Sequence, residues 1–176
     1  MSDPHVSLRP VAAGDLAMFR RFCLEPGLIG LDWAGFRDPE APARRFALDS
    51  YLGEHDGRLI IEAFDAKAAG FVSYRSGSYG GQAPYWEIGI ALLPEWRGRG
   101  IGWRAQAQLC DYLFTHTPAQ RIQAGTHPEN LAEQKSLVKA GFQLEGIVRA
   151  CEFRAGKWRD GYLYSRLRGD PVPAMG

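Results

Sequence analysis

The chain of 176 residues is poor in cysteine, almost without net charge and free of long apolar runs. Its three cysteines, Cys23, Cys110 and Cys151, are odd in number and widely spaced, so they form neither a disulfide framework nor a metal-ligand pattern. We therefore expect reduced thiols, no metal and a cytoplasmic protein. A formal net charge of +1 argues against nucleic acid or an anionic membrane surface as the main partner.

No segment approaches the length needed to span a membrane, and no apolar run follows a basic region near the start. The sequence thus predicts neither a membrane helix nor a signal peptide. Hydrophobic residues make up 45% and charged residues 23% of the chain, which is ordinary for one globular domain with a sizeable core. We expect that domain over residues 1–170 and a loose tail over residues 171–176.

What the sequence does contain is a glycine-rich turn between two segments of different periodicity. Residues 85–93 alternate between two largely apolar faces, which is typical of a strand buried on both sides. From Ile101 onward apolar residues recur at helical spacing until Pro118. Three glycines at 98, 100 and 102 therefore lie where a strand passes into a helix.

A glycine turn at the start of a helix suits an anionic ligand. Glycine allows positive φ and close approach of a ligand to the backbone, and the helix start presents unpaired N–H groups. Arg97 and Arg99 add positive charge. The turn is neither a phosphate loop nor a dinucleotide fingerprint, because no Gly-Lys-Ser/Thr follows and position 103 is tryptophan. An ordinary tight connection with exposed arginines is the alternative.

Periodicity and turn residues predict the order β-α-α-β-β-β-α-β-α-β-β along the chain. We expect strands near residues 6–9, 59–64, 69–75, 85–93, 121–126, 142–153 and 157–167, and helices near 15–25, 38–52, 101–117 and 131–140. Residues 28–37 are expected to form a loop and residues 76–82 a flexible connection. The fold class is α/β, a single domain whose mixed, mostly antiparallel, twisted sheet has about seven strands and about four helices.

The glycine turn resembles the pyrophosphate-binding motif of the GNAT superfamily of acetyl-CoA-dependent N-acetyltransferases. That motif, Gln/Arg-x-x-Gly-x-Gly/Ala, is filled by Arg97, Gly100 and Gly102, and the predicted element order is that of the family. A second family segment is matched by Asn130 and, at the family spacing, Gly141-Phe142.

Trp158 and Asp160 in the last strand make the chain most similar to the branch with the ribosomal-protein Nα-acetyltransferases. The resemblance implies acetyl-CoA as co-substrate, no metal, and direct transfer of the acetyl group to a primary amine.

The resemblance also implies where acetyl-CoA binds. A central strand that splays from its neighbour would hold pantetheine through the main chain of Ile90, Ala91 and Leu92. The expected cofactor residues beyond this strand are Arg97, Gly98, Arg99, Gly100, Ile101, Gly102, Asn130 and Lys135. For Asn130 the local alternative is a helix N-cap, and for Lys135 an ordinary solvated lysine.

Glu87 is our candidate general base, because it is the only ionisable side chain within a very apolar strand. The alternative is a solvated glutamate near the strand start. His127, just after the next strand, is the second candidate. Leu137 stands where many members of the family have a tyrosine that protonates the CoA thiolate, so that donor stays unassigned and the thiolate can leave into water.

We expect the acceptor site between the two early helices, the loop that joins them and the final hairpin. Its candidate lining residues are Trp33, Phe36, Arg37, Trp86 and Trp158, with core packing as the alternative for each aromatic. The acceptor is either a small-molecule amine or a protein N-terminus, and the protein a monomer or homodimer. The rival from another class is a CoA-binding module without catalysis.

Overall fold

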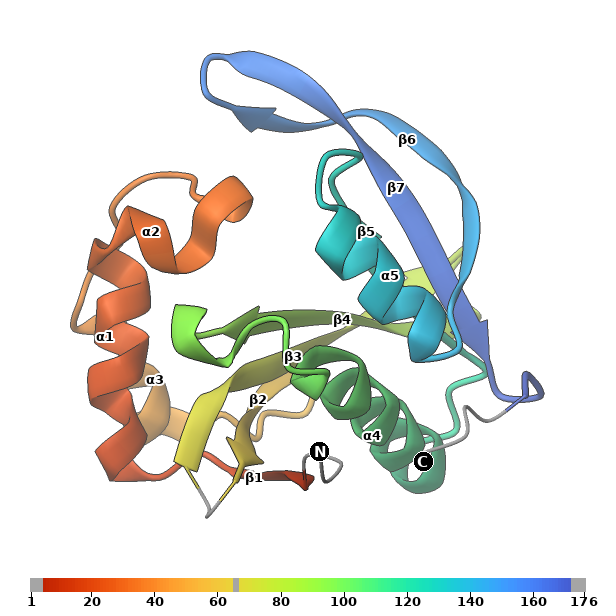
Figure 1. The fold of residues 1–176 in the computed structure, drawn as a ribbon. Coiled ribbons are helices and arrows are strands. Elements are labelled where there is room, and N and C mark those ends of the chain that lie inside the picture. Colours follow the sequence, from red (N-terminus) through yellow and green to blue (C-terminus); the bar gives the residue numbers. More distant parts are fainter. Residues whose placement is uncertain (1–4, 65–66, 172–176) are drawn as a thin grey trace.

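The computed structural model describes residues 5–64 and 67–171, so most of the expected tail lies outside the described residues. Its centre is a seven-stranded sheet in the order β1-β2-β3-β4-β5-β7-β6. Every neighbouring pair is antiparallel except β4 with β5, which are parallel. This confirms the expected α/β class and the mixed, mostly antiparallel sheet (Figure 1).

The strands are β1 Val6–Pro10, β2 Asp56–Ala63, β3 Lys67–Tyr79, β4 Ala83–Leu92, β5 Arg121–Thr126, β6 Gln143–Arg154 and β7 Lys157–Leu167. The α-helices are α1 Leu16–Leu24, α2 Pro26–Ile29, α3 Ala41–Asp49, α4 Ile101–His116 and α5 Leu131–Lys139. Short 3-10 turns lie at Ala13–Asp15, Gly30–Asp32 and Pro94–Trp96. None of the helices in the described segments is long and apolar enough to cross a membrane.

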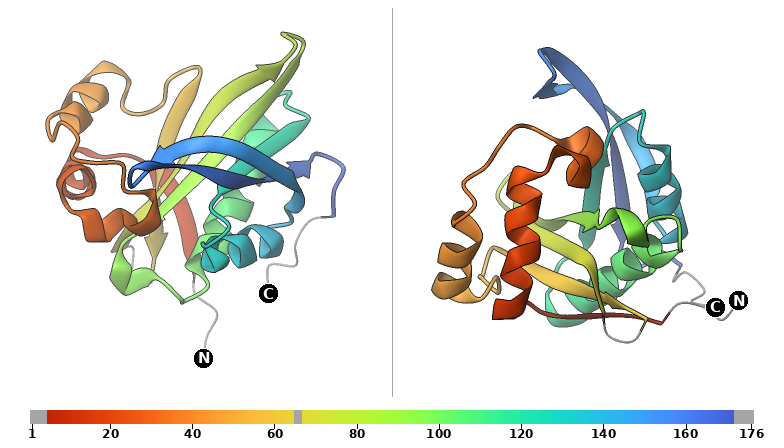
Figure 2. Two further views of the ribbon diagram at one scale, coloured as in Figure 1. Left: turned by 90° about the horizontal axis from the view of Figure 1, so that it is seen from above. Right: turned by 60° about the vertical axis from the view of Figure 1, so that its left-hand side comes forward.

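Helices cover both faces of the sheet, α4 and α5 one face, α1 to α3 the other (Figures 1 and 2). The main core lies under α4, where Ile101 and Leu109 pack with Ile88 of β4 and Ile122 of β5. Each such side chain contributes about 1.5–3 kcal/mol when fully buried. A smaller core on the other face stacks Phe19 of α1 on Tyr51, with ring centroids 5.1 Å apart. The sheet is therefore packed against helices on both faces.

Two expected irregular segments are partly regular in the structure. The first helix ends at Leu24, just before Pro26, as expected, but Pro26 also starts a new helical turn. Residues 28–32 of the expected loop 28–37 therefore belong to α2 and the following 3-10 turn, and residues 33–37 are irregular. Leu28 of α2 is buried against Phe22 and Leu93. The expected connection 76–82 is shorter and covers only residues 80–82, since β3 runs to Tyr79 by pairing with Ala83 of β4. In both cases contacts with distant or paired segments outweigh local composition.

The limits of the second expected helix also differ from expectation. The second expected helix begins at Ala41, because the Asp38 carboxylate accepts a hydrogen bond from the Glu40 backbone N–H at 2.9 Å and forms a turn. It ends at Asp49, since Ser50 and Tyr51 take positive φ. On α5 only Leu137 is buried.

Candidate active site

The parallel strands β4 and β5 pair over a short stretch and then separate. Only residues 85–87 of β4 pair with residues 121–123 of β5, although β4 continues to Leu92 and β5 to Thr126. The backbone of residues 88–92 therefore faces an opening without ladder hydrogen bonds on the β5 side. Unpaired backbone groups need hydrogen-bonding partners, and the amides of a pantetheine arm can supply them. Ile90, Ala91 and Leu92, the expected pantetheine contacts, lie along this opening.

The glycine turn leads from the end of β4 into α4. Gly98 and Gly100 take φ values of +71° and +75°, and Gly100 is the N-cap of α4 without any side-chain cap. The first N–H groups of a 16-residue helix are thus left for another partner. Gly102 sits in the first turn, where an added Cβ would come 3.2 Å from the hydroxyl of Ser136. The backbone here is accessible only because the side chains are missing.

The two arginines of the turn are used differently. Nε of Arg97 donates a hydrogen bond to the backbone oxygen of Leu92 at 3.0 Å, and its Nη2 donates to that of Leu28. Arg97 thus binds main-chain carbonyls. The Arg99 guanidinium is exposed and lies 5.4 Å from the ring of Trp96. Of the two, only Arg97 is hydrogen-bonded to the main chain within the described residues.

Asn130 and Lys135 lie on α5. The Oδ1 atom of Asn130 accepts a hydrogen bond from the Glu133 backbone N–H at 3.2 Å, which confirms the N-cap. Within the described residues nothing bonds its amide nitrogen, so the N-cap leaves that donor available. Lys135 is exposed, and the described part of the chain offers it no ion pair.

A polar chain that the sequence did not predict runs from α5 to α4. Ser136 donates a hydrogen bond to Oε1 of Gln106 at 2.7 Å, and the Gln106 amide nitrogen donates to Glu133 at 2.5 Å. Gln106 is fully buried, whereas Leu137 packs in the apolar core. The Ser136 hydroxyl lies beside Gly102, so the polar chain borders the glycine turn. The one feature of the sequence that could have indicated this polar chain is Gln106, a polar residue among the buried apolar residues of α4.

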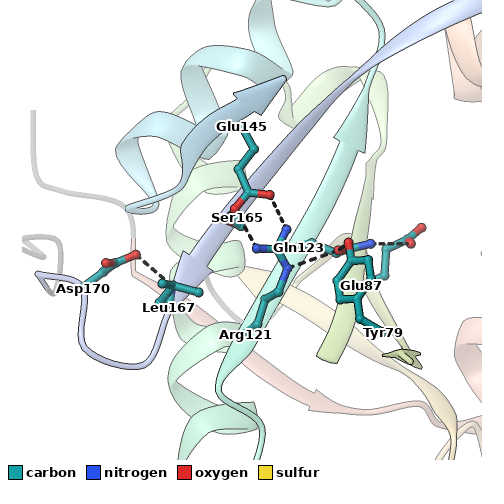
Figure 3. Close-up of polar contacts among 8 residues, drawn as sticks. All are labelled: Tyr79, Glu87, Arg121, Gln123, Glu145, Ser165, Leu167 and Asp170. Atoms are coloured by element: carbon teal, nitrogen blue, oxygen red, sulfur yellow. Dashed lines mark hydrogen bonds and ion pairs between the residues drawn. The ribbon is translucent and has the colours of Figure 1, made fainter. Parts of the chain in front are cut away.

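Glu87 is held by partners on two strands. Its Oε1 accepts a hydrogen bond from Arg75 of β3 at 2.5 Å. Its Oε2 accepts one from the Gln123 amide of β5 at 3.3 Å (Figure 3). Tyr79 donates to the other end of the Gln123 amide at 2.8 Å. The Glu87 side chain is 30% exposed, so it is neither fully solvated nor sealed in the core. It stands at the point where β4 and β5 begin to separate.

A second cluster fixes the paired end of these strands (Figure 3). Arg121 of β5 donates to both carboxylate oxygens of Glu145, and Ser165 of β7 donates to Oε1 of the same carboxylate at 2.6 Å. The hydrogen bond from Arg121, followed by the one from Ser165, lowers the pKa of Glu145 to about 2, against the opposing effect of burial. The closed part of the β4–β5 pair is thereby joined to the last hairpin.

His127 lies far from Glu87. Gln123, which contacts Glu87, is four residues earlier on β5, a span of roughly 13 Å at the rise of a strand. His127 is 7% exposed, and its Nε2 lies 3.1 Å from Oε2 of Glu152 on β6, an ion pair when the imidazole is protonated. The structure therefore does not bring the two candidate bases into one site. No group of three or more His, Cys, Asp or Glu suited to a metal occurs among the described residues.

The residues expected to line the acceptor site lie in two exposed groups, except for Trp86. Trp33 and Phe36 meet edge to face at 5.4 Å beside the exposed Arg37, and Phe36 is 77% exposed. Trp158 forms a similar pair with Phe153 at the hairpin end, which projects over the sheet toward α2 (Figures 1 and 2).

Trp86 is the exception. Its indole N–H donates to Thr117 at 3.0 Å, and its ring packs against Tyr74 and the α4 core. Trp86 therefore packs in the core, which was the alternative to lining the acceptor site. Because successive side chains of a strand point to opposite faces, Glu87 faces the other side of the sheet.

Comparison with known proteins identifies the family to which this fold belongs. The chain belongs to the acetyltransferase (GNAT) domain family, whose model matches residues 5–143. It is 38% identical over 82 residues to the uncharacterized N-acetyltransferase p20 of Bacillus licheniformis, covering 47% of this chain and 46% of that protein. The chain thus spans about half the length of the curated relatives it matches.

Solved structures extend the similarity over nearly the whole chain. RimJ of Mycobacterium smegmatis, in complex with CoA-disulfide, is 25% identical with a TM-score of 0.74, covering 93% of this chain and 82% of that one. The Vibrio cholerae spermidine N-acetyltransferase, in complex with CoA and spermine, has a TM-score of 0.80 at 18% identity, covering 93% and 95%. At that identity the second likeness concerns the fold alone. The Rim-type resemblance is confirmed.

Proposed function

We propose that this protein transfers the acetyl group of acetyl-CoA to a primary amine by direct attack in a ternary complex. The observation that carries the proposal is the separation of β4 from β5 after three paired residues, beside the uncapped start of α4. The opening accepts an extended pantetheine arm, and the α4 N-terminus accepts the pyrophosphate. Glu87 stands at the inner end of this opening, where β4 and β5 begin to separate.

The chemistry assigned to the chain has two parts. A backbone N–H near Leu92 polarises the thioester carbonyl and stabilises the oxyanion, which is worth several kcal/mol in a preorganised site, about 2.7–4 for one donor. Glu87 takes the proton from the ammonium group, directly or through water, so that the amine lone pair attacks the carbonyl carbon. The C–N bond forms first and gives the tetrahedral oxyanion. This adduct collapses as the C–S bond breaks, the nitrogen loses its second proton to solvent, and the thiolate takes a proton from solvent. Asn130 holds the pantetheine arm through its amide nitrogen.

The acceptor is a primary amine, on a small molecule or at a protein N-terminus. The spermidine N-acetyltransferase of Vibrio cholerae and the ribosomal-protein-S5-alanine acetyltransferase of Vibrio fischeri, which share this fold, show by their names that one fold serves different acceptors, so the fold alone selects none. The two exposed aromatic pairs, at Trp33 and at Trp158, are placed to contact an acceptor that enters from outside the sheet.

One observation favours a second candidate function, a CoA-binding module without catalysis. Leu137 is fully buried where many members of the family have a tyrosine, so no acid for the thiolate occupies that position. The modest basicity of a thiolate, about that of a free cysteine, makes such an acid dispensable. Binding without turnover is what this second function would show.

The test is CoA release from acetyl-CoA with a panel of amines and peptides. We expect release that depends on the acceptor, with an acetylated product seen by mass spectrometry. Acetyl-CoA binding without any acceptor-dependent release would favour the non-catalytic module. Absence of binding would overturn both functions.

A further inference from the structure

A cavity of about 280 Å³ lies outside the cofactor site, between the end of the last hairpin and the loop from β5 to α5. Its lining residues are His127, Pro128, Glu129, Arg154, Trp158, Arg159 and Asp160. The hairpin brings Arg154 of β6 and Arg159 of β7 to the same cavity. In Figure 1 the hairpin passes over the start of α5 on its way toward α2.

Both arginines of this cavity have a nitrogen atom without a hydrogen-bond partner among the described residues. Asp160 accepts a hydrogen bond from the Ala150 backbone N–H at 2.8 Å, and Glu129 approaches Arg159 only to 3.9 Å. Nη1 of Arg154 and Nε of Arg159 are enclosed, and within the described residues neither has a hydrogen-bond partner. An enclosed donor on a cation that lacks a partner is unfavourable, so a ligand with acceptor oxygens would be stabilised here.

The geometry points to a carboxylate as that ligand. Two arginine side chains with free N–H groups match the two oxygens of a carboxylate, and such charge-assisted hydrogen bonds are the strong ones. A water occupies about 30 Å³, so the cavity is several times larger than a single water needs. Trp158 at the rim offers an apolar surface for the stem of an acidic side chain. We propose that Arg154 and Arg159 bind a carboxylate of the acceptor, an inference that rests on the proposed acetyl transfer.

Distance decides which kind of acceptor fits. His127, which lines the cavity, is roughly 13 Å along β5 from the residue that contacts Glu87. On that basis the reacting amine and the bound carboxylate are separated by roughly 10–13 Å, which an extended peptide covers with about three or four residues at ~3.3–3.6 Å each. A free α-amino acid is too short. The acceptor is thus a peptide or protein N-terminus with aspartate or glutamate at about its third residue.

The experiment compares short peptides with amidated C-termini that differ only by aspartate or asparagine at the third position, with free aspartate as a further acceptor. KM and kcat are measured for the wild type, Arg154→Gln, Arg159→Gln and Arg149→Gln. Arg149 is the matched control, because it is exposed on the same strand and does not line the cavity. Thermal melting checks that each variant is folded.

We expect the acidic peptide to have a KM at least tenfold below that of its amide twin. Arg154→Gln and Arg159→Gln should remove most of this difference with kcat within twofold, and Arg149→Gln should retain it. Equal KM values for the two peptides in the wild type, preference for free aspartate, or equal losses in Arg149→Gln would overturn the inference.

Calorimetry separates this inference from the proposed function. Binding of the acidic peptide to the CoA-bound protein, weakened in Arg154→Gln, supports the cavity even if no turnover occurs. Turnover of amines without acidic preference retains the proposed function and overturns the cavity assignment. If the cavity binds only water, the two peptides will have equal affinities.

Discussion

The guanidinium of Arg97 donates a hydrogen bond to the backbone carbonyl oxygen of Leu28 in α2. It also donates to the carbonyl oxygen of Leu92 at the end of β4. A single side chain thereby connects α2 with the turn that precedes α4. Because both of its hydrogen-bond acceptors belong to the main chain, Arg97 organises this turn, and we expect Arg99 to be the arginine that contacts a phosphate.

The two arginines should therefore respond differently to substitution. For Arg97→Gln we expect a loss of about 1–3 kcal/mol in the free energy of unfolding, because hydrogen bonds from a charged donor are removed. For Arg99→Gln we expect stability within about 0.5 kcal/mol. Its acetyl-CoA affinity should fall several-fold, and more at low than at high salt. Thermal unfolding and calorimetry at two salt concentrations distinguish the variants, and the reverse pattern would refute this division of roles.

Asn130 combines an N-cap with a proposed contact to pantetheine, and two substitutions separate these roles. Asn130→Asp retains a good N-cap and removes the amide donor, so it should preserve stability and weaken acetyl-CoA binding. Asn130→Ala should weaken binding and also cost about 1 kcal/mol of stability. Equal acetyl-CoA affinity in the wild type and the aspartate variant would show that Asn130 is only a helix cap.

Gly100→Val tests the approach of the backbone to pyrophosphate. Valine at φ +75° is strained, and its side chain would occupy the start of α4, so we expect acetyl-CoA affinity to fall tenfold or more, about 1.4 kcal/mol or above. Gly81→Val is the matched control, since Gly81 has φ +80° in the β3–β4 turn and is remote from the site. Calorimetry that gives the folded Gly100→Val variant unchanged affinity would contradict the assignment of this turn.

The elements whose limits were predicted well are those with a clear hydrophobic periodicity in their own sequence. The limits of β5 at Arg121–Thr126 were predicted directly, and α4 and the last hairpin within a residue or two. The single turn α2 could not be predicted, because it depends on burial of Leu28 against residues far away in the sequence. Propensity gives no information about such a contact.

The same distinction between local patterns and long-range contacts applies to the candidate site. The Asn130 cap and the glycine turn are local, so the sequence indicated both. The polar chain from Ser136 to Glu133 and the cavity at Arg154 form only when helices or strands meet, and no spacing in the sequence reports that meeting. Arg97 matched the family motif, but the direction of its side chain follows from the position of Leu28.

Glu145 should make stability depend on pH. Its pKa is lowered from an ordinary 4.5 to about 2, so its contribution is fully present above pH 4.5 and is lost as the pH falls toward 2. The side chain is 38% exposed, and solvent screening reduces the effect, so Glu145→Gln should cost about 1 kcal/mol at pH 7.

Chemical denaturation at several pH values checks this expectation. The stability difference between the wild type and Glu145→Gln should narrow as the pH falls from 4.5 to 3. Glu54→Gln, at an exposed position, serves as the control and should differ little from the wild type at any pH. A difference that stays constant down to pH 3 would mean that the charge of Glu145 does not contribute.

The central claim is that the β4–β5 opening is a site of amine acetylation in which Glu87 accepts the proton. A primary alkyl amine is mostly protonated at neutral pH, with a pKa near 10.4, and a positioned base is worth about 10²- to 10⁴-fold in rate. Glu87→Gln should therefore keep the fold and the acetyl-CoA affinity. Glu62→Gln is the matched control, because Glu62 is also an ion-paired strand glutamate, bound to Arg9 at 2.7 Å away from the opening.

The decisive measurement is the rate of amine-dependent CoA release against pH for the wild type, Glu87→Gln and Glu62→Gln. We expect Glu87→Gln to lower kcat about 10²-fold or more at neutral pH, with a deficit that shrinks at high pH as free amine becomes abundant. Glu62→Gln should follow the wild type throughout. A Glu87→Gln variant that releases CoA at the wild-type rate over the whole pH range would contradict the account.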